Sequence, residues 1–370
     1  AGALPRGGGR GRGRAGAGAG GGGGAGGGMA TELEPMRTLP AAGDQFAAED
    51  LDGIELIDKL ATLGVSAADV KKAKDAGYHT VRSLLMSPKK HLWNIKGLSE
   101  AKVEKMLDAA RKLSGEVGFI TGCQLLDRKR SVLKISTGCQ TIDALVGGIE
   151  TQCVTELYGE FKTGKTQLCS TVCVTTQLPT ESGGGAGKVC YIDTEGSFRP
   201  DRIMPIAERY GLSPEEVLGN IVYARAHTSD NQMDLINMTA GLFAEEPFRL
   251  LVIDSLTALL RVDYVGRGEL ADRQAKLGAM LSKLKKLAEE YNIAVLVTNQ
   301  VMADPSGQMF VMDPKKHVGG HIMAHASTCR FMTRKGKGDT RVLKVIQHPS
   351  VGESEAVFQI TSGGIVDAED

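Results

Sequence analysis

The chain contains one octapeptide that constrains its fold more than any other feature, Gly159-Glu160-Phe161-Lys162-Thr163-Gly164-Lys165-Thr166. It fits the pattern G-x-x-x-x-G-K-[ST] completely, between a β-rich run that ends at Tyr158 and a helical stretch that starts at Gln167. Such glycines let backbone amides curl around a polyphosphate at a helix N-terminus. We predict that residues 159–167 bind a polyphosphate, with Lys165 at the β- and γ-phosphates and the Thr166 hydroxyl on Mg²⁺. A chance glycine-rich turn is the alternative interpretation.

Short apolar runs predict a parallel sheet from about residue 131 to residue 370. Four of them end at polar residues and are separated by helical segments: 154–158, 188–193, 249–254 and 294–298. Between the third and fourth runs, one set of apolar residues recurs at helical spacing and predicts a buried stripe: Leu277, Met280, Leu281, Leu284, Leu287 and Ala288. After residue 326 the runs shorten, which predicts hairpin strands. The predicted fold class is α/β, a mostly parallel sheet with flanking helices.

Three of these strands end at residues suited to phosphoryl transfer. Asp254 has the form of a second ligand for Mg²⁺, so we predict that it acts together with Thr166. Glu195 is the candidate that orients and deprotonates the attacking water, with a surface carboxylate as the alternative. Gln300 lies where an amide could sense the γ-phosphate and pass its state to the following loop. Glu195, Lys165 and Gln300 form the predicted catalytic set.

Two segments after the third and fourth strands have the composition of DNA-binding loops. Residues 261–268 combine Arg261, Tyr264 and Arg267 with two glycines, which suits phosphate contact and base stacking. Residues 302–320 are long, contain Gly and Met, and include Lys315 and Lys316. A solvated loop is the alternative for the first segment.

The chain divides into segments of different composition. Residues 1–28 are mostly Gly and Ala with four arginines and no acid, and they predict a disordered tail. Residues 29–50 predict a flexible acidic arm. A helical N-terminal domain is predicted for 51–114, where helical periodicity begins near Leu51 and Asn94 to Ser99 forms the turn of a helix-hairpin-helix. That turn could hold a phosphate or only join packed helices. A linker at 115–130 then leads to the core at 131–370.

Composition limits the remaining possibilities. Lys plus Arg and Asp plus Glu both number 44, so any nucleic-acid contact must come from local loops. No apolar run approaches the roughly 18 residues of a membrane span, and we expect an intracellular protein without membrane contact. Seven scattered cysteines without a C-x-x-C pair predict free thiols, mostly in the core. His317, His321 and His325 are four apart, but Gly319 and Gly320 should break the helix that a metal site would need.

The order of these motifs resembles the RecA/RadA-type strand-exchange recombinases, in particular the meiosis-specific recombinases of eukaryotes. The resemblance covers about residues 51 to 370 and depends on five strings: NIKGLSEAKVEK at 94–105, GEFKTGKTQ at 159–167, FRPDR at 198–202, RVDYVGRGEL at 261–270 and GGHI at 319–322. It implies a RecA-type ATPase core joined to the helical domain. It also implies a DNA-dependent ATPase that assembles as a nucleoprotein filament or ring.

The resemblance assigns further roles to particular residues. Arg202 would lie against adenine, and segments 261–272 and 302–320 would be the two DNA-binding loops. Residues 119–122 resemble the linker motif that inserts Phe119 into a neighbouring subunit, where Ala224 and Ala226 would form the receiving strand. The implied partners are single-stranded and double-stranded DNA, further copies of the chain and accessory recombination proteins. The implied location is the nucleus.

The sequence departs from the family pattern at three places. The linker motif ends in Gly122 instead of Ala, and Lys335-Gly336-Lys337 stands for a usual Lys-Gly-Arg. Gln347 and Gly352 stand where the family usually has an Asp and a later Pro that cap the neighbour's ATP. We therefore expect a perturbed cap and an altered salt or cation dependence of ATP turnover.

These observations leave three hypotheses. The first is an ATP-dependent recombinase that coats single-stranded DNA and pairs it with homologous duplex, with ATP stabilising the extended filament. The second is an accessory paralogue that binds ATP without strand exchange, which the altered cap favours and the intact Glu195 opposes. The third is a P-loop ATPase of another class, such as a hexameric helicase.

Overall fold

The computed structural model describes residues 53–115, 118–303 and 315–368. The predicted tail at 1–28 and the predicted arm at 29–50 lie outside the described residues, as does the middle of the second predicted DNA-binding loop.

The helices between residues 57 and 114 pack around an apolar core of their own. They are the 3-10 helix η2 (Ile57–Leu63) and the α-helices α1 (Ala67–Asp75), α2 (Val81–Leu85), α3 (Lys89–Trp93) and α4 (Glu100–Ser114). The predicted onset of helix near Leu51 is wrong for residues 53–56, because Leu56 forms an antiparallel bridge with Thr80 and regular helix begins at Ile57. Gly97 turns the chain between α3 and α4 with a φ of +80°, and its carbonyl accepts a hydrogen bond from Lys72 Nζ at 2.9 Å.

Helix α5 (Gly122–Lys129) lies inside the predicted linker. Thr121 begins it with a capping box, because the Thr121 hydroxyl accepts from the Gln124 amide at 3.2 Å while Gln124 Oε1 accepts from the Thr121 amide at 2.8 Å. Over this stretch of described chain, none of the residues of α5 is buried. The helix is therefore fixed by its own cap and not by packing.

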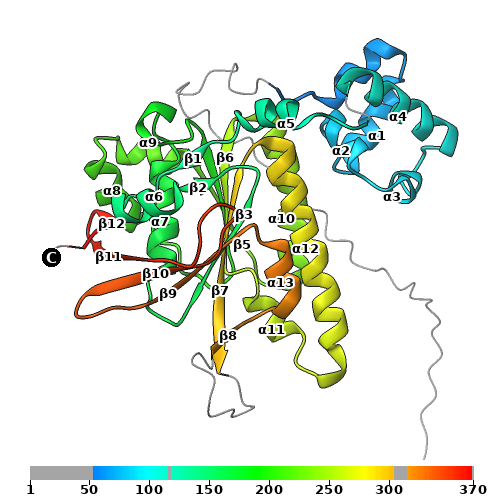
Figure 1. Ribbon diagram of the computed structural model, residues 1–370. Coiled ribbons are helices and arrows are strands. Elements are labelled where there is room, and N and C mark those ends of the chain that lie inside the picture. The colour runs from blue at the N-terminus through cyan, green and yellow to red at the C-terminus, as the bar shows by residue number, and fades with distance from the viewer. Residues whose placement is uncertain (1–52, 116–117, 304–314, 369–370) are drawn as a thin grey trace, which may run out of the picture. The chain divides into compact units, whose positions relative to one another are not determined.

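Ten of the described strands form one mixed sheet in the order β12-β11-β10-β9-β3-β7-β6-β4-β5, with β8 paired to β7 (Figure 1). The strands from β9 to β5 are parallel, and the hairpins β9 to β12 are antiparallel. The parallel strands are β3 (Val154–Gly159), β4 (Lys188–Asp193), β5 (Ile221–Arg225), β6 (Phe248–Asp254), β7 (Ala294–Ala303) and β9 (Cys329–Lys335). The others are β8 (Lys315–His317), β10 (Thr340–Gln347), β11 (Glu355–Thr361), β12 (Gly364–Asp367) and the separate pair β1 (Lys134–Ile135) and β2 (Ile149–Glu150). The predicted α/β class and the four strands are confirmed, but the fourth strand does not end near residue 298, because β7 continues to Ala303 where it pairs with β8.

Helices cover both faces of this sheet (Figure 1). One face packs against α6 (Gln140–Val146), α7 (Lys165–Thr175), α8 (Pro200–Arg209) and α9 (Pro214–Gly219). The other packs against α10 (Ser229–Glu245), α11 (Ala258–Asp263), α12 (Leu270–Tyr291) and α13 (Gly320–Ala326). All six residues of the predicted stripe are buried on α12. Among the described helices, none combines the length and the apolar composition needed to cross a membrane.

All seven cysteines are free, as predicted, and five of them are buried. Cys169 and Cys173 lie within α7, and Cys190 lies on β4. Burial raises the pKa of the Cys190 thiol to about 12. These thiols therefore act as small apolar core residues.

Asp367 at the end of β12 caps helix α6. Its carboxylate accepts hydrogen bonds from the Thr141 hydroxyl at 2.6 Å, the Thr141 amide at 2.7 Å and the Gln140 amide at 3.1 Å. The hydrogen bond from the Thr141 hydroxyl is the main cause that holds the pKa of Asp367 below its ordinary value of 3.8. The charged carboxylate is therefore the form that stabilises the fold.

We expect Asp367→Asn to lower the free energy of unfolding by about 1 kcal/mol at neutral pH, the usual cost of a lost cap. Because the folded-state pKa is depressed, the stabilisation is complete above the ordinary value and is lost as pH falls below it. Thermal unfolding of both proteins at pH 7 and pH 3 checks this. The difference should shrink at the lower pH, and an equal difference at both would contradict the assigned charge.

Candidate nucleotide-binding site

The loop between β3 and α7 is held in a fixed curve by its own residues. Gly164 has a φ of +100°, and a Cβ there would meet Cδ1 of Ile360 at 3.0 Å, so the position requires glycine. The buried Thr163 hydroxyl donates to the Glu160 carbonyl at 2.8 Å and also lies 2.8 Å from the Thr333 hydroxyl. The loop therefore leads directly into the N-terminus of α7, where free amides favour an anion.

A cavity of about 1050 Å³ adjoins this loop. Every residue from 159 to 167 lines it, and Arg202, Asp254, Glu195 and Gln300 line it as well. The parallel register explains why, since β3, β7, β6 and β4 are neighbours whose carboxyl ends meet at one edge of the sheet. The structure thus brings together all the residues predicted for nucleotide binding and catalysis.

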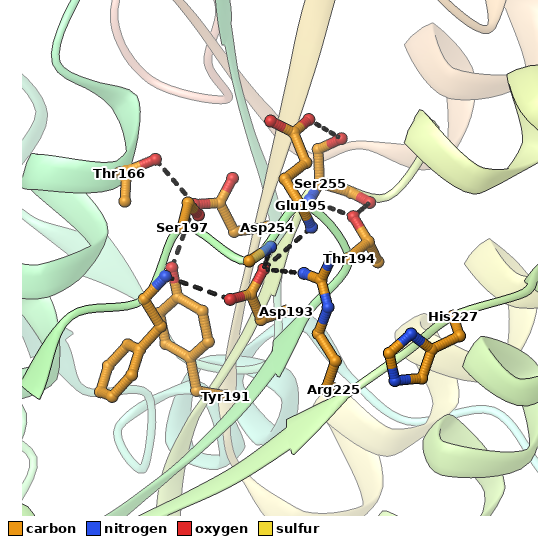
Figure 2. A network of polar contacts seen from close by, with 12 residues as sticks. Thr166, Tyr191, Asp193, Thr194, Glu195, Ser197, Arg225, His227, Asp254 and Ser255 are labelled. Atoms are coloured by element: carbon orange, nitrogen blue, oxygen red, sulfur yellow. Dashed lines mark hydrogen bonds and ion pairs between the residues drawn. The ribbon is translucent and has the colours of Figure 1, made fainter.

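Asp254 lines this cavity and is almost fully buried. Its carboxylate accepts hydrogen bonds from the hydroxyls of Thr166 at 2.8 Å and Tyr191 at 3.0 Å (Figure 2). The hydroxyls of Ser197 and Thr298 also donate to it. Four hydroxyl donors from four segments fix the carboxylate beside Thr166, the arrangement expected of two oxygen ligands for a hard cation.

Lys165 lies at the first turn of α7 between the loop and two acids. Its Nζ donates to the carbonyls of Gly159 at 2.9 Å and Glu160 at 2.7 Å. Burial lowers the pKa of Lys165, and the carboxylates of Asp254 and Glu195 act in the opposite direction. The ammonium group is therefore placed inside the cavity as a cationic contact for an anion.

Glu195 is exposed at the edge of the cavity, where two neighbours orient it. The Ser255 hydroxyl donates to Glu195 Oε1 at 3.0 Å (Figure 2), and Gln300 Nε2 donates to the same oxygen at 2.8 Å. Gln300 Oε1 in turn accepts from Arg261 NH1 at 3.2 Å. The amide of Gln300 therefore joins the predicted catalytic carboxylate to the first predicted DNA-binding segment.

Asp193 is a site residue that the sequence reasoning missed. Its carboxylate accepts from the backbone amides of Glu195 at 2.9 Å and Gly196 at 2.7 Å, and it pairs with Arg225 at 2.8 Å. Figure 2 shows this carboxylate at the centre of the network. Asp193 thus shapes the turn that carries Glu195. The signal was an Asp at a strand end two residues before an exposed acid, since Asp side chains commonly bond the backbone two residues ahead.

Arg202 lies in the cavity wall, where the resemblance placed adenine. Its Nε donates to Gln167 Oε1 at 2.6 Å, and NH1 donates to the Ser362 carbonyl at 2.6 Å. NH2 donates to the carbonyl of Thr361. Burial lowers the pKa of this guanidinium. Arg202 therefore joins α7, α8 and the β11–β12 turn at the cavity.

The first predicted DNA-binding loop is shorter than expected. Residues 261–263 belong to helix α11, because Leu259 and Leu260 anchor that helix in the core, and residues 267–269 form the 3-10 helix η4 (Arg267–Glu269). Arg261 is exposed, and the ring of Tyr264 lies 5.7 Å from Lys276 Nζ. The side chain of Arg267 lies outside the described part of the structure.

The second predicted loop is not structureless throughout. Strand β8 pairs antiparallel with the end of β7, and α13 begins at Gly320 after a left-handed Gly319. Residues 304–314 and the side chains of Lys315 and Lys316 lie outside what the structure describes. The glycine pair starts a helix after His317 and leaves His321 and His325 together on it, with their rings 6.2 Å apart. Over the described side chains, no cluster of three His, Cys, Asp or Glu residues that could hold a metal was found.

The residues predicted for self-assembly occupy two separate surfaces. Phe119 is fully exposed, and Gly122 is the first residue of α5. Ala224 is half-buried on β5, the edge strand of the sheet, whereas Ala226 is completely buried. The receiving role of these two alanines stays a prediction, and in the single chain Ala226 lies in the same apolar cluster as residues of α10.

Gln347 lies at the end of β10 beside a cavity of about 390 Å³ that Lys285, His325 and His348 also line. Its Nε2 donates to the Ser327 carbonyl at 3.2 Å. None of the described residues that line this smaller cavity carries a carboxylate.

Comparison with known proteins shows the family to which the chain belongs. A model of the Rad51 family matches residues 128–368. The chain belongs to the Rad51 family. A "Meiotic recombination protein DMC1 homolog" of Arabidopsis thaliana is 59% identical over 323 residues, which cover 87% of this chain and 94% of that protein. The "Meiotic recombination protein DMC1/LIM15 homolog" is 53% identical over 318 residues in Mus musculus (85% and 93%) and 50% identical over 329 residues in Homo sapiens (88% and 96%). The resemblance predicted from the sequence is confirmed.

Proposed function

We propose that the chain is an ATP-dependent DNA strand-exchange recombinase that acts in meiotic recombination as a filament on single-stranded DNA. The observation that carries the proposal is the cavity of about 1050 Å³ in which residues 159–167, Asp254, Glu195 and Gln300 meet. Gln300 is bonded there to Arg261 of the first DNA-binding segment. Membership of the Rad51 family and similarity to proteins named for meiotic recombination support the same function.

The donor set of the cavity fits ATP with Mg²⁺. Backbone amides at the start of α7 and the Lys165 ammonium bind phosphate oxygens. Thr166 and Asp254 offer two hard oxygen ligands 2.8 Å apart and would hold the metal. When bound, Mg²⁺ supplies positive charge that neutralises the phosphates. The half-buried Arg202 borders the same cavity on the side suited to the base.

Glu195 is the group that takes a proton from the attacking water. Its carboxylate is exposed to the cavity and held on one oxygen by Ser255 and Gln300, which leaves the other oxygen for water. The position of this carboxylate is the main argument for the role, because a general base must reach the proton that it removes. Asp193 holds the backbone of the turn so that the carboxylate keeps its direction.

DNA binds through local segments because the whole chain carries no net charge. Arg261 and Arg267 contact phosphates, Tyr264 stacks on bases, and Lys315 and Lys316 extend the second contact. The bond from Arg261 to Gln300 lets DNA at the first segment influence Glu195.

Self-assembly uses the exposed Phe119 of one copy and the edge strand β5 of the next. An edge strand can accept another extended segment, and a small residue such as Ala224 leaves room for an aromatic ring. Accessory recombination proteins are further expected partners, and the nucleus is the expected location.

Strand exchange with purified protein, homologous DNA and ATP, together with electron microscopy on single-stranded DNA, tests the function. We expect joint molecules and filaments that need ATP. ATP binding without joint molecules would support the accessory paralogue instead. Hexameric rings that unwind DNA would support the helicase.

We expect Gln347→Asp to change the cation dependence of ATP turnover by about threefold, the effect of one partly exposed charge. The variant places a carboxylate in a cavity lined by Lys285, His325 and His348. Turnover is measured at increasing Ca²⁺, Mg²⁺ and salt, with Gln347→Asn as the neutral control. If Gln347→Asp responds to these ions like the unmodified protein, the altered ATP cap does not determine the cation dependence of turnover.

A further inference from the structure

Asn299 is a buried amide whose four hydrogen-bonding positions are all used. Its Oδ1 accepts from the Thr257 hydroxyl at 2.7 Å and from the backbone amide of Gln300 at 2.8 Å. Its Nδ2 donates to Glu156 Oε1 and to the Val318 carbonyl, both at 2.7 Å. The donors and acceptors around it allow only this orientation of the amide. Any rotation of the side chain would therefore leave buried polar groups without partners.

The partners of Asn299 are the starting points of three functional segments. Thr257 is the N-cap of α11, the helix that carries Arg261. Val318 follows β8 and precedes α13, where the second DNA-binding segment returns to the core, and its amide donates to the Gln300 carbonyl at 3.1 Å. Gln300 itself contacts Glu195. One side chain thus fixes the first DNA-binding segment, the second and the contact to the catalytic carboxylate.

A buried ion pair between Glu156 and Arg330 holds the side-chain amide of Asn299 in place. Arg330 Nε donates to Glu156 Oε2 at 2.7 Å, while Asn299 occupies the other oxygen of Glu156. The side chain of Glu156 is completely buried, and that of Arg330 is 7% exposed. Because such a pair is costly to break, the carboxylate of Glu156 is a rigidly held hydrogen-bond partner on β3. In the parallel register Asn299 lies opposite Tyr158, one residue before the nucleotide-binding loop begins.

We propose that Asn299 is a positioning residue that couples both DNA-binding segments to Gln300, and so sets how strongly DNA stimulates ATP turnover. The proposal rests on the proposed function. Asn299 does not line the nucleotide cavity, so it acts through Gln300 and Thr257 and not by contact with ATP. A shift of either segment on DNA moves a partner of the saturated amide, and the amide transmits the shift to Gln300.

The test compares Thr257→Val with Thr257→Ser in the full chain. Valine has the shape of threonine but lacks the hydroxyl, whereas serine keeps it. We expect Thr257→Val to lower the stimulation of kcat by single-stranded DNA about fivefold, as for one buried hydrogen bond. The DNA-free kcat and the KM for ATP should stay near those of the original chain. Thr257→Ser should retain the stimulation.

Asn299→Asp provides a second variant of nearly the same size. It loses both donors and turns a carboxylate toward Glu156, so we expect a greater loss of stimulation than with Thr257→Val. Full stimulation in Thr257→Val or in Asn299→Asp would overturn the proposal. It would also be overturned if the melting temperature, the DNA-free kcat and the KM all changed with the stimulation, because that result indicates a merely structural role. An original chain without DNA-stimulated turnover would overturn both the coupling and the proposed function.

Discussion

Glu195→Gln should lower the kcat for ATP by about 100-fold or more, while ATP still binds. A positioned general base contributes about 100-fold to 10,000-fold, and an amide cannot accept the proton. The variant keeps the size of the side chain and an acceptor oxygen for Ser255 and Gln300. Because Lys165, Thr166 and the loop amides remain, the affinity for ATP should change little. Steady-state turnover with single-stranded DNA and binding of a fluorescent ATP analogue measure the two effects.

Glu195→Gln should also change the lifetime of the complex with DNA. If hydrolysis releases the filament, complexes of Glu195→Gln with DNA and ATP should last longer than those of the original chain. Glu215→Gln is the matched control, because Glu215 is another carboxylate, lies on α9 and does not line the cavity. Undiminished turnover in Glu195→Gln would exclude this residue as the base, whatever the control shows.

The sequence predicted those parts of the site that depend on neighbours along the chain. The nucleotide-binding loop is a continuous motif, and the strands that carry Asp254 and Gln300 follow from short apolar runs. Seven residues of α12 are buried, and six of these were predicted from their helical spacing. Local periodicity was sufficient to predict these elements, because the apolar face of each helix or strand is the face that packs against the core.

The parts that the sequence did not predict depend on distant partners. Glu156 and Arg330 form their pair across 174 positions of the chain, and Asn299 meets Glu156 across 143. No spacing rule connects such residues before the strand order is known. Residues 261–263 have a loop-like composition but are helical, because Leu259 and Leu260 bury the start of that helix. Tertiary packing decided the structure there.

Assembly depends on a surface that the single chain leaves open. Phe119 is fully exposed, and Ile120, Leu125 and Leu126 beside it are exposed by 41%, 47% and 64%. A group of large apolar side chains in contact with water favours burial against a partner. Thr121 and Gln124 already hold the start of α5 in a capping box. Docking of Phe119 therefore costs little further conformational entropy in this segment.

Phe119→Glu should therefore abolish filament formation while the nucleotide site continues to bind ATP. Removing an aromatic anchor from an interface costs about 2–4 kcal/mol, which weakens each junction about 30-fold to 1000-fold. Analytical ultracentrifugation with ATP and electron microscopy on single-stranded DNA measure assembly. Leu63→Glu adds the same charge at a side chain that is 41% exposed and should assemble normally. If Phe119→Glu forms filaments as readily as this control, Phe119 is not the anchor, and the exposed leucines of α5 become the next candidates.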